Sequence, residues 1–284
     1  HPDLRATYLP VIELCAERLL SPASLAIGRD AWGEDPLRSL ASQKGHAYLG
    51  YANMALSMLT LLEPSNRFAD ANEAITDALA RRLREAPHGI IETYPGEAYP
   101  PDLAAVVGSI ALFDRAKGAD HGEAVRRGVE SLRRFRDPRS GLLHQSVDAD
   151  TGRPLSPGRG SGSAFAVFAL SFTHPELARE LFEPVARQRE SLLGFGAIRE
   201  YPAGASGSGD IDSGPVVLGV SVSATGFALA GARLARDEDL FAALYRTAEL
   251  FGVAVPRSGR TRFLSGGPLG NAILLAMLTA GGTP

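Results

Sequence analysis

The sequence predicts an all-helical fold, an α/α toroid of about five to six helical hairpins with long polar loops on one face. Apolar residues recur at i, i+3 and i+4 along most of the chain, and strand-like alternation is brief. Glycines follow the charged helical segments roughly every 55 residues, which indicates a structural repeat. These repeat positions are Gly33, Gly89, Gly141, Gly196 and Gly252.

Each repeat contains one charged amphipathic helix and one helix rich in Gly, Ala and Ser. A helix with few charges must be shielded nearly all round, so the second kind should lie inside and the first kind outside. The predicted outer helices are 66–86, 120–135, 174–193 and 237–251, and the inner ones are 44–62, 101–117, 161–173, 214–235 and 266–281. A first helix, 2–20, would close the ring against 266–281 within a single domain, 1–284. An open α-solenoid is the alternative.

The composition is that of a globular protein, with 45% hydrophobic and 21% charged residues in 284. The net charge of −3, without a basic run interleaved with aromatics, argues against nucleic-acid binding. No apolar stretch approaches the roughly 20 residues that span a bilayer. Cys15, the only cysteine, lies in an apolar helical segment and is expected to be a buried, inert thiol.

Several properties stay open at this level. The chain starts at His1, which suggests a trimmed or mature form, and arginine almost replaces lysine, which suggests a bacterial source. The protein could be cytoplasmic, or exported with its N-terminal segment removed. No phosphate-loop, zinc-protease, CxxC or GxSxG motif is present, so no metal or cofactor is predicted. Nothing in the sequence indicates an oligomeric state.

Four acidic residues are the catalytic candidates, and they come from two of the long loops. Glu97 and Asp102 lie where the inner helix 101–117 begins, and Asp210 and Asp212 lie in a glycine-rich segment. Two nearby carboxylates can share a proton, bind a cation or pair with an arginine. Asp102 could instead be a helix cap or a partner of the helix dipole, and the Asp210 segment a solvated turn.

Other loop residues are candidates for substrate binding. An aromatic ring can stack on a sugar, and an arginine set between glycines can present its guanidinium to a carboxylate or phosphate. The candidates are Trp32, His46, Glu92, Tyr94, Tyr99, His144, Arg159 and Tyr201. By contrast, Asp148, Asp150 and Gly152 are typical of a turn.

Two local runs resemble known families. The run YPPD at 99–102, followed by SGLLHQSVDADTG and GRGSGSA, resembles linalool dehydratase/isomerase-like proteins. The run GDIDSGP resembles the acidic loops of unsaturated glucuronyl hydrolase-like glycosidases of the six-hairpin α/α-toroid superfamily. The resemblance implies the toroid and a role for Asp102. The linalool enzyme's chemistry is associated with cavity cysteines, which this chain lacks apart from Cys15, so that mechanism does not carry over.

Three functions remain as hypotheses, and the first two make the protein an enzyme. The favoured one is a carbohydrate-active enzyme, a glycoside hydrolase with paired carboxylates or a lyase using a tyrosine with His46 or His144. The second is a lyase or isomerase acting on a small terpenoid or alcohol. The third is a non-catalytic helical-repeat scaffold. The expected ligand of either enzyme is a small molecule or an oligosaccharide.

Overall fold

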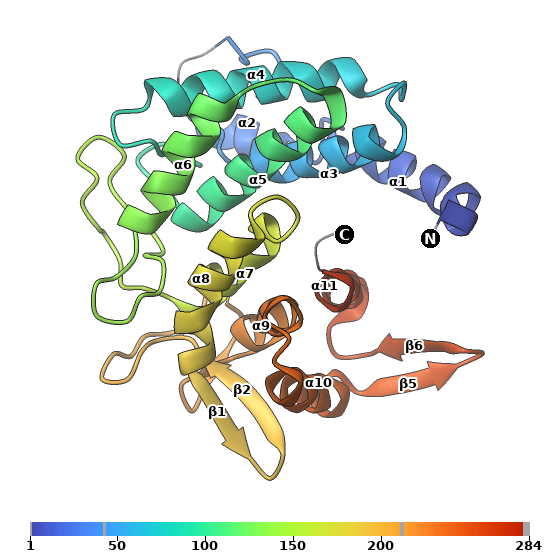
Figure 1. The fold of residues 1–284 in the computed structure, drawn as a ribbon, viewed down its shortest axis with the longest axis vertical. Helices are drawn as coiled ribbons and strands as arrows, with labels where there is room; N and C mark the ends of the chain where they lie inside the picture. Colours follow the sequence, from blue (N-terminus) through green and yellow to red (C-terminus); the bar gives the residue numbers. More distant parts are fainter. Residues whose placement is uncertain (1, 42–43, 211–212, 281–284) are drawn as a thin grey trace. The chain divides into compact units, whose positions relative to one another are not determined.

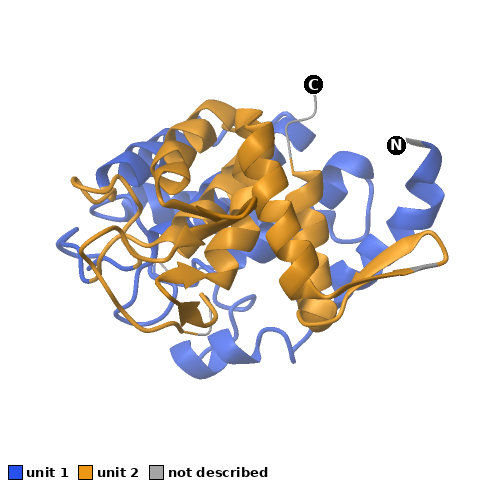
Figure 2. Ribbon diagram, turned by 90° about the horizontal axis from the view of Figure 1, so that it is seen from below, with its two compact units in different colours: residues 1–134, 146–155 blue, residues 135–145, 156–284 orange. Residues whose placement is uncertain are grey.

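A computed structural model describes residues 2–41, 44–210 and 213–280, and helices predominate among them (Figure 1). The predicted mostly helical class is therefore confirmed. The chain divides into two compact units, residues 1–134 with 146–155 and residues 135–145 with 156–284 (Figure 2). The closed ring and the single domain remain predictions.

The first unit is built on two nearly uncharged helices, α3 (Leu49–Leu62) and α5 (Pro100–Lys117), which pack against each other. The amphipathic helices α4 (Ala69–Glu85) and α6 (Gly122–Arg134) cover them and also contact each other. Nearly every residue of α5 between Pro100 and Phe113 is buried, as expected for an inner helix. The unit begins with a short 3₁₀ turn, η1 (Pro2–Leu4), followed by α1 (Arg5–Leu19) and α2 (Ala26–Trp32).

A buried polar network fixes α3 against α4 and α5. The Asn53 side-chain amide donates to Thr76 Oγ1 at 3.0 Å and Ser109 Oγ at 3.1 Å, and its carbonyl oxygen accepts from Asn72 at 2.8 Å. Asn72 also donates to Ser57 and accepts from the Thr60 hydroxyl. All six side chains are fully buried, so each lost contact would leave a polar atom unsatisfied in the core.

The second unit repeats this plan. The inner helices α7 (Gly160–Leu170), α9 (Val222–Ala235) and α11 (Gly267–Thr279) pack in sequence, α7 on α9 and α9 on α11. The amphipathic helices α8 (Pro175–Arg187) and α10 (Glu238–Gly252) contact α9. Phe182 of α8 lies directly over Gly231 of α9, where any side chain at position 231 would overlap its ring.

Small sheets interrupt the helices of the second unit, which the sequence analysis did not predict. Strands β1 (Arg189–Leu192), β2 (Phe195–Arg199), β4 (Val220–Ser221) and β3 (Val216–Val217) form one antiparallel sheet in that order. Strands β5 (Ala254–Arg257) and β6 (Arg260–Phe263) form a separate hairpin. The expected helix 174–193 ends at Arg187, because the Leu193–Gly194 pair adopts the positive φ angles of a tight hairpin turn.

Two other local expectations are wrong. Trp32 is not in a loop but ends the short helix α2, where Gly33 with φ of 69° terminates the helix. Cys15 is exposed, because α1 buries only Ala16 and turns most of its apolar residues outward. The apolar residues of α1 predict a buried helix, but among the described residues of α1 only Ala16 is buried.

We expect Asn72→Ala to lower the free energy of unfolding by about 2 kcal/mol, because Asn53, Ser57 and Thr60 each lose one buried hydrogen bond. Urea denaturation measures this change. Glu73→Ala, one position along α4 on its exposed side, is the matched control and should change the free energy by less than about 0.5 kcal/mol. Equal effects of the two variants would contradict a structural role for the network.

Candidate functional site

Asp102 lies in the first turn of α5, and its carboxylate is held by two hydroxyl groups. Tyr51 of α3 donates to Oδ1, and Thr93 of the preceding loop donates to Oδ2 at 2.5 Å. Helix α5 begins at Pro100, and an acidic side chain in its first turn is also favourably placed for the helix dipole. The half-buried carboxylate is oriented by two separate elements.

Aromatic rings are connected to this carboxylate through Thr93. The Trp32 indole N–H donates to the Thr93 carbonyl at 2.9 Å, and the Trp32 ring lies against the backbone of Gly45. The rings of Tyr48 and Tyr94 stack with their centroids 6.0 Å apart and an interplanar angle of 18°. These rings are partly exposed, as required of surfaces on which a ligand could stack.

A chain of three polar side chains runs behind the aromatic rings. His46 Nε2 lies 2.9 Å from Glu34 Oε1, and His46 Nδ1 lies 3.1 Å from the Tyr48 hydroxyl oxygen. Burial lowers the pKa of His46, and the hydrogen bond from His46 lowers the pKa of Glu34. With Glu34 ionised and His46 neutral, the imidazole donates from Nε2 and accepts the Tyr48 proton at Nδ1.

An arginine of α4 forms hydrogen bonds with the loop that contains His46. The buried Arg82 guanidinium donates to the carbonyl oxygens of Ser39, Leu40 and Gly45, at 3.0, 3.3 and 3.1 Å. His46 itself has a φ of 63°, which is uncommon for a residue with a side chain. These contacts hold its ring between Trp32 and Tyr48.

We call these side chains the Asp102 cluster. Three of its members besides Asp102 were predicted as site residues from the sequence, and the others are positioned around them by α2, α3 and the loop before α5. The cluster consists of Trp32, Glu34, His46, Tyr48, Tyr51, Thr93, Tyr94 and Asp102.

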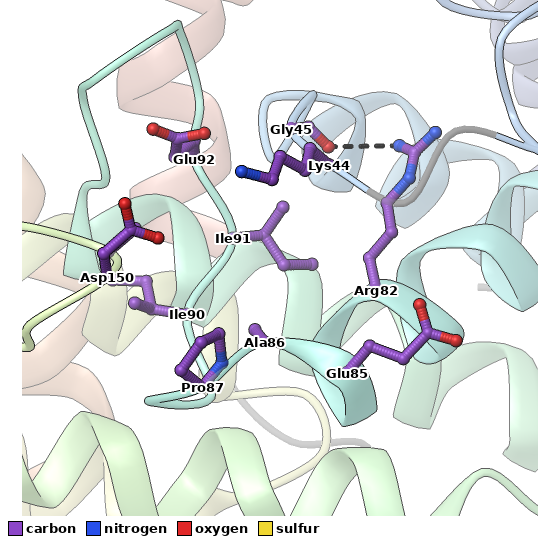
Figure 3. A pocket seen from close by; sticks show the side chains of 11 residues that line it. Lys44, Gly45, Arg82, Glu85, Ala86, Pro87, Ile90, Ile91, Glu92 and Asp150 are labelled. Atoms are coloured by element: carbon purple, nitrogen blue, oxygen red, sulfur yellow. Dashed lines mark hydrogen bonds between the residues drawn. The ribbon is translucent and has the colours of Figure 1, made fainter.

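Three other predicted residues of this unit lie outside the cluster. Glu97 accepts from the Tyr99 hydroxyl on an exposed turn. Glu92 accepts from the Gly96 N–H at 2.9 Å and lines a pocket of about 170 Å³ together with Lys44 and Asp150 (Figure 3). Lys44 extends over Ile91 towards the side where both carboxylates lie. The pocket is smaller than the cavities of ~300 Å³ and more that enclose drug-sized ligands.

The pocket nevertheless shows that three of the predicted loops meet. Its lining comes from the loop before α3, the loop before α5 and the segment 146–155. The Val147 N–H donates to the Ala98 carbonyl, and the His88 ring contacts the Asp150 carbonyl at 3.0 Å. The expected turn is also present, because the Thr151 N–H donates to the Asp148 carboxylate at 2.8 Å.

The second unit contains a separate charged cluster around Arg159. This residue precedes α7, is buried, and donates from Nε to Glu200 Oε1 at 2.6 Å and from Nη1 to Asp210. Ser161 also donates to Glu200, at 2.7 Å. The Arg159 guanidinium lies 5.5 Å from the centre of the Tyr201 ring, close enough for a cation–π interaction.

The charges of this cluster stabilise one another. Burial lowers the pKa of Arg159, but the hydrogen bonds and charges of Asp210 and Glu200 outweigh burial and raise it above its ordinary value. For the carboxyl group of Asp210 burial acts in the opposite direction and raises the pKa. The Arg159 guanidinium and the Ser213 N–H outweigh this effect and lower the pKa of Asp210 to about 2. Arg159 Nη2 and Glu200 Oε2 are buried and find no hydrogen-bond partner among the described residues.

Two further predicted residues are not part of either cluster as described. His144 is buried, and its Nδ1 lies 2.8 Å from the Ser156 carbonyl oxygen, which fixes the loop that contains it. Asp212 lies outside the described residues, so its catalytic role remains a prediction. Within residues 2–41, 44–210 and 213–280, no three His, Cys, Asp or Glu side chains form a metal site. No helix of that part of the chain is long and apolar enough to cross a membrane.

Five members of the two clusters were not predicted as site residues from the sequence, namely Glu34, Tyr48, Tyr51, Thr93 and Glu200. Tyr51 could have been found as the only aromatic residue of an inner helix, in its first turn. Glu200 follows the short strand β2, and no pattern in the sequence connects it with Arg159.

Comparison with known proteins identifies no family. No family model and no curated protein matches the sequence. One solved structure similar to this chain is a family 105 glycoside hydrolase of C. acetobutylicum ATCC 824, with 15% sequence identity and a TM-score of 0.44. The similarity covers 70% of this chain and 64% of that one, so this chain spans less than two thirds of that structure.

We expect acid to weaken the Arg159 cluster. The pKa of Asp210 is lower in the folded state than its ordinary value of 3.8, so its contribution to stability is present above that value and is lost as the pH falls towards about 2. Urea midpoints of the wild type and Asp210→Asn, measured against pH, should therefore differ near neutrality and converge below pH 3.8. A constant difference across this range would contradict the ion pair.

Proposed function

We propose that this protein is a carbohydrate-active enzyme of the glycoside hydrolase type, with Asp102 as a catalytic carboxylate. The observation that carries this proposal is the Asp102 carboxylate itself, oriented by the Tyr51 and Thr93 hydroxyls and connected to aromatic rings. Glycoside cleavage requires a carboxyl group in a fixed position at the bond that breaks. Aromatic rings beside such a group provide stacking surfaces for sugar rings.

Tyr51 and Thr93 are positioning residues in this proposal. Because they come from α3 and from the loop before α5, they hold Asp102 in one orientation before a substrate binds. Glu34 is a second carboxylate of the same cluster, and its lowered pKa keeps it ionised, as a general base must be. The catalytic roles expected for Glu97, Asp210 and Asp212 remain predictions.

One observation favours elimination as a second candidate reaction. The chain from Glu34 through His46 to the Tyr48 hydroxyl could move a proton, as the tyrosine and histidine of a polysaccharide lyase would. Burial raises the pKa of Tyr48, so this hydroxyl keeps its proton at neutral pH. A hydrolase would not need this proton path.

We expect Asp102→Asn to reduce the release of reducing ends from a panel of oligosaccharides by at least about 100-fold. Asp70→Asn is the matched control, because Asp70 is exposed in the first turn of α4 just as Asp102 lies in the first turn of α5. Circular dichroism and thermal unfolding show whether both variants fold. Equal activity of the wild type and the folded Asp102→Asn variant would remove Asp102 from the mechanism.

Tyr48→Phe distinguishes the two reactions. If the enzyme hydrolyses its substrate, Tyr48→Phe should retain most of the reducing-end release, and the products should show no ultraviolet absorbance from a new double bond. If the reaction is an elimination, the wild type should generate that absorbance and Tyr48→Phe should lower its rate by at least about 100-fold. Tyr99→Phe, on the exposed turn, is the control and should behave as the wild type.

A further inference from the structure

The C-terminal part of the second unit has an unusual distribution of charge. The chain as a whole has a net charge of −3, yet residues 250–284 contain no Asp or Glu and three arginines, at 257, 260 and 262. All three lie in the β5–β6 hairpin, which extends away from α10 and α11 (Figures 1 and 2). A positive charge is therefore concentrated on a protruding element of an acidic protein.

The register of the hairpin separates its two faces. Val255 pairs with Arg262, and position 257 pairs with Arg260. The same register continues beyond the strands to Val253 and Leu264, where the Leu264 N–H donates to the Val253 carbonyl at 3.3 Å. Because residues alternate along a strand, Val255, Arg260, Arg262 and Leu264 share one face, and we call these residues, together with Val253 at the base of the hairpin, the arginine face.

The opposite face holds the hairpin to its own unit. Phe263 is buried and contacts Gly252 at the end of α10. The Asn271 side chain of α11 accepts from the Phe263 N–H at 2.9 Å and donates to its carbonyl at 2.7 Å. The arginine face therefore does not make the contacts that hold the hairpin to α10 and α11.

Every member of the arginine face is exposed. Val253 and Leu264 are 50% and 52% exposed, and the neighbouring Phe251, at the end of α10, is 70% exposed. Arg260 and Arg262 contact no carboxylate among the described residues. The arginine face thus places apolar side chains at the base of the hairpin and unpaired positive charges towards its tip.

We propose that the arginine face binds the surface of a membrane that contains anionic lipids. Arginine guanidinium groups pair with lipid phosphates and carboxylates, and exposed Leu, Val and Phe side chains enter the boundary between headgroups and acyl chains. The exposed apolar side chains favour a lipid surface over an acidic protein or polysaccharide. Such a partner would pair with the arginines but would leave the apolar side chains in water. A second copy of the hairpin is disfavoured, because it would bring arginine against arginine.

Sedimentation with vesicles tests this proposal. The wild type should bind vesicles of phosphatidylcholine with phosphatidylserine more tightly than vesicles of phosphatidylcholine alone, and added salt should weaken the binding. Arg260→Gln with Arg262→Gln should lower the partition coefficient about 25-fold, since each arginine near an anionic surface contributes about fivefold. Phe251→Ser with Leu264→Ser should also weaken binding to the phosphatidylserine vesicles.

The matched control is Arg38→Gln with Arg84→Gln, which removes the same charge from exposed positions of the first unit and should leave binding unchanged. Thermal unfolding of each variant establishes that it is folded. The proposal is overturned if phosphatidylserine does not improve binding, or if the control pair weakens binding as much as the hairpin pair. It is also overturned if soluble polyaspartate binds the wild type while the Phe251 and Leu264 changes leave vesicle binding intact.

Discussion

The close approach of α3 and α5 is the constraint on which the first unit and its candidate site depend. A side chain at Gly50 would come within 2.7 Å of the Val106 backbone nitrogen, so only glycine lets the two helices approach this closely. The amide of Asn53 then fixes their relative position through Thr76 and Ser109. Tyr51, between these two positions on α3, reaches Asp102 on α5 because of that spacing.

The sequence predicted the helices of this architecture well, because each inner helix has few charges and each outer helix has an amphipathic stripe. The small sheets of the second unit were not predicted from the sequence. One residue separates the end of α8 from strand β1, and the feature that makes this segment a hairpin rather than a longer helix is the tight turn at Leu193 and Gly194. The prediction that Cys15 is a buried thiol was also wrong, because this residue is exposed. Whether an apolar helix is buried depends on what packs against it. In α1 the apolar side chains of Tyr8, Val11 and Leu14 are exposed.

Part of the candidate site could be predicted from the sequence, because its residue types differ from those of the inner helices beside it. Asp102, Trp32, His46 and Tyr94 are conspicuous because polar and aromatic side chains are unusual beside an inner helix. Tyr51 and Glu200 are not conspicuous, because each acquires its role only through a partner far away in the chain. The two clusters also differ in kind. Hydroxyl groups orient the Asp102 carboxylate, whereas a guanidinium charge holds the Asp210 carboxylate ionised.

Arg82 has a consequence for how such a protein can diversify. Its guanidinium contacts the backbone oxygens of Ser39, Leu40 and Gly45, and backbone oxygens are present whatever amino acid occupies a position. Arg82 of α4 therefore holds the backbone at these three positions whichever side chains they carry. Substitutions at Ser39 or Leu40 can accumulate without removing these contacts, so the side chains can diversify while the backbone contacts stay the same.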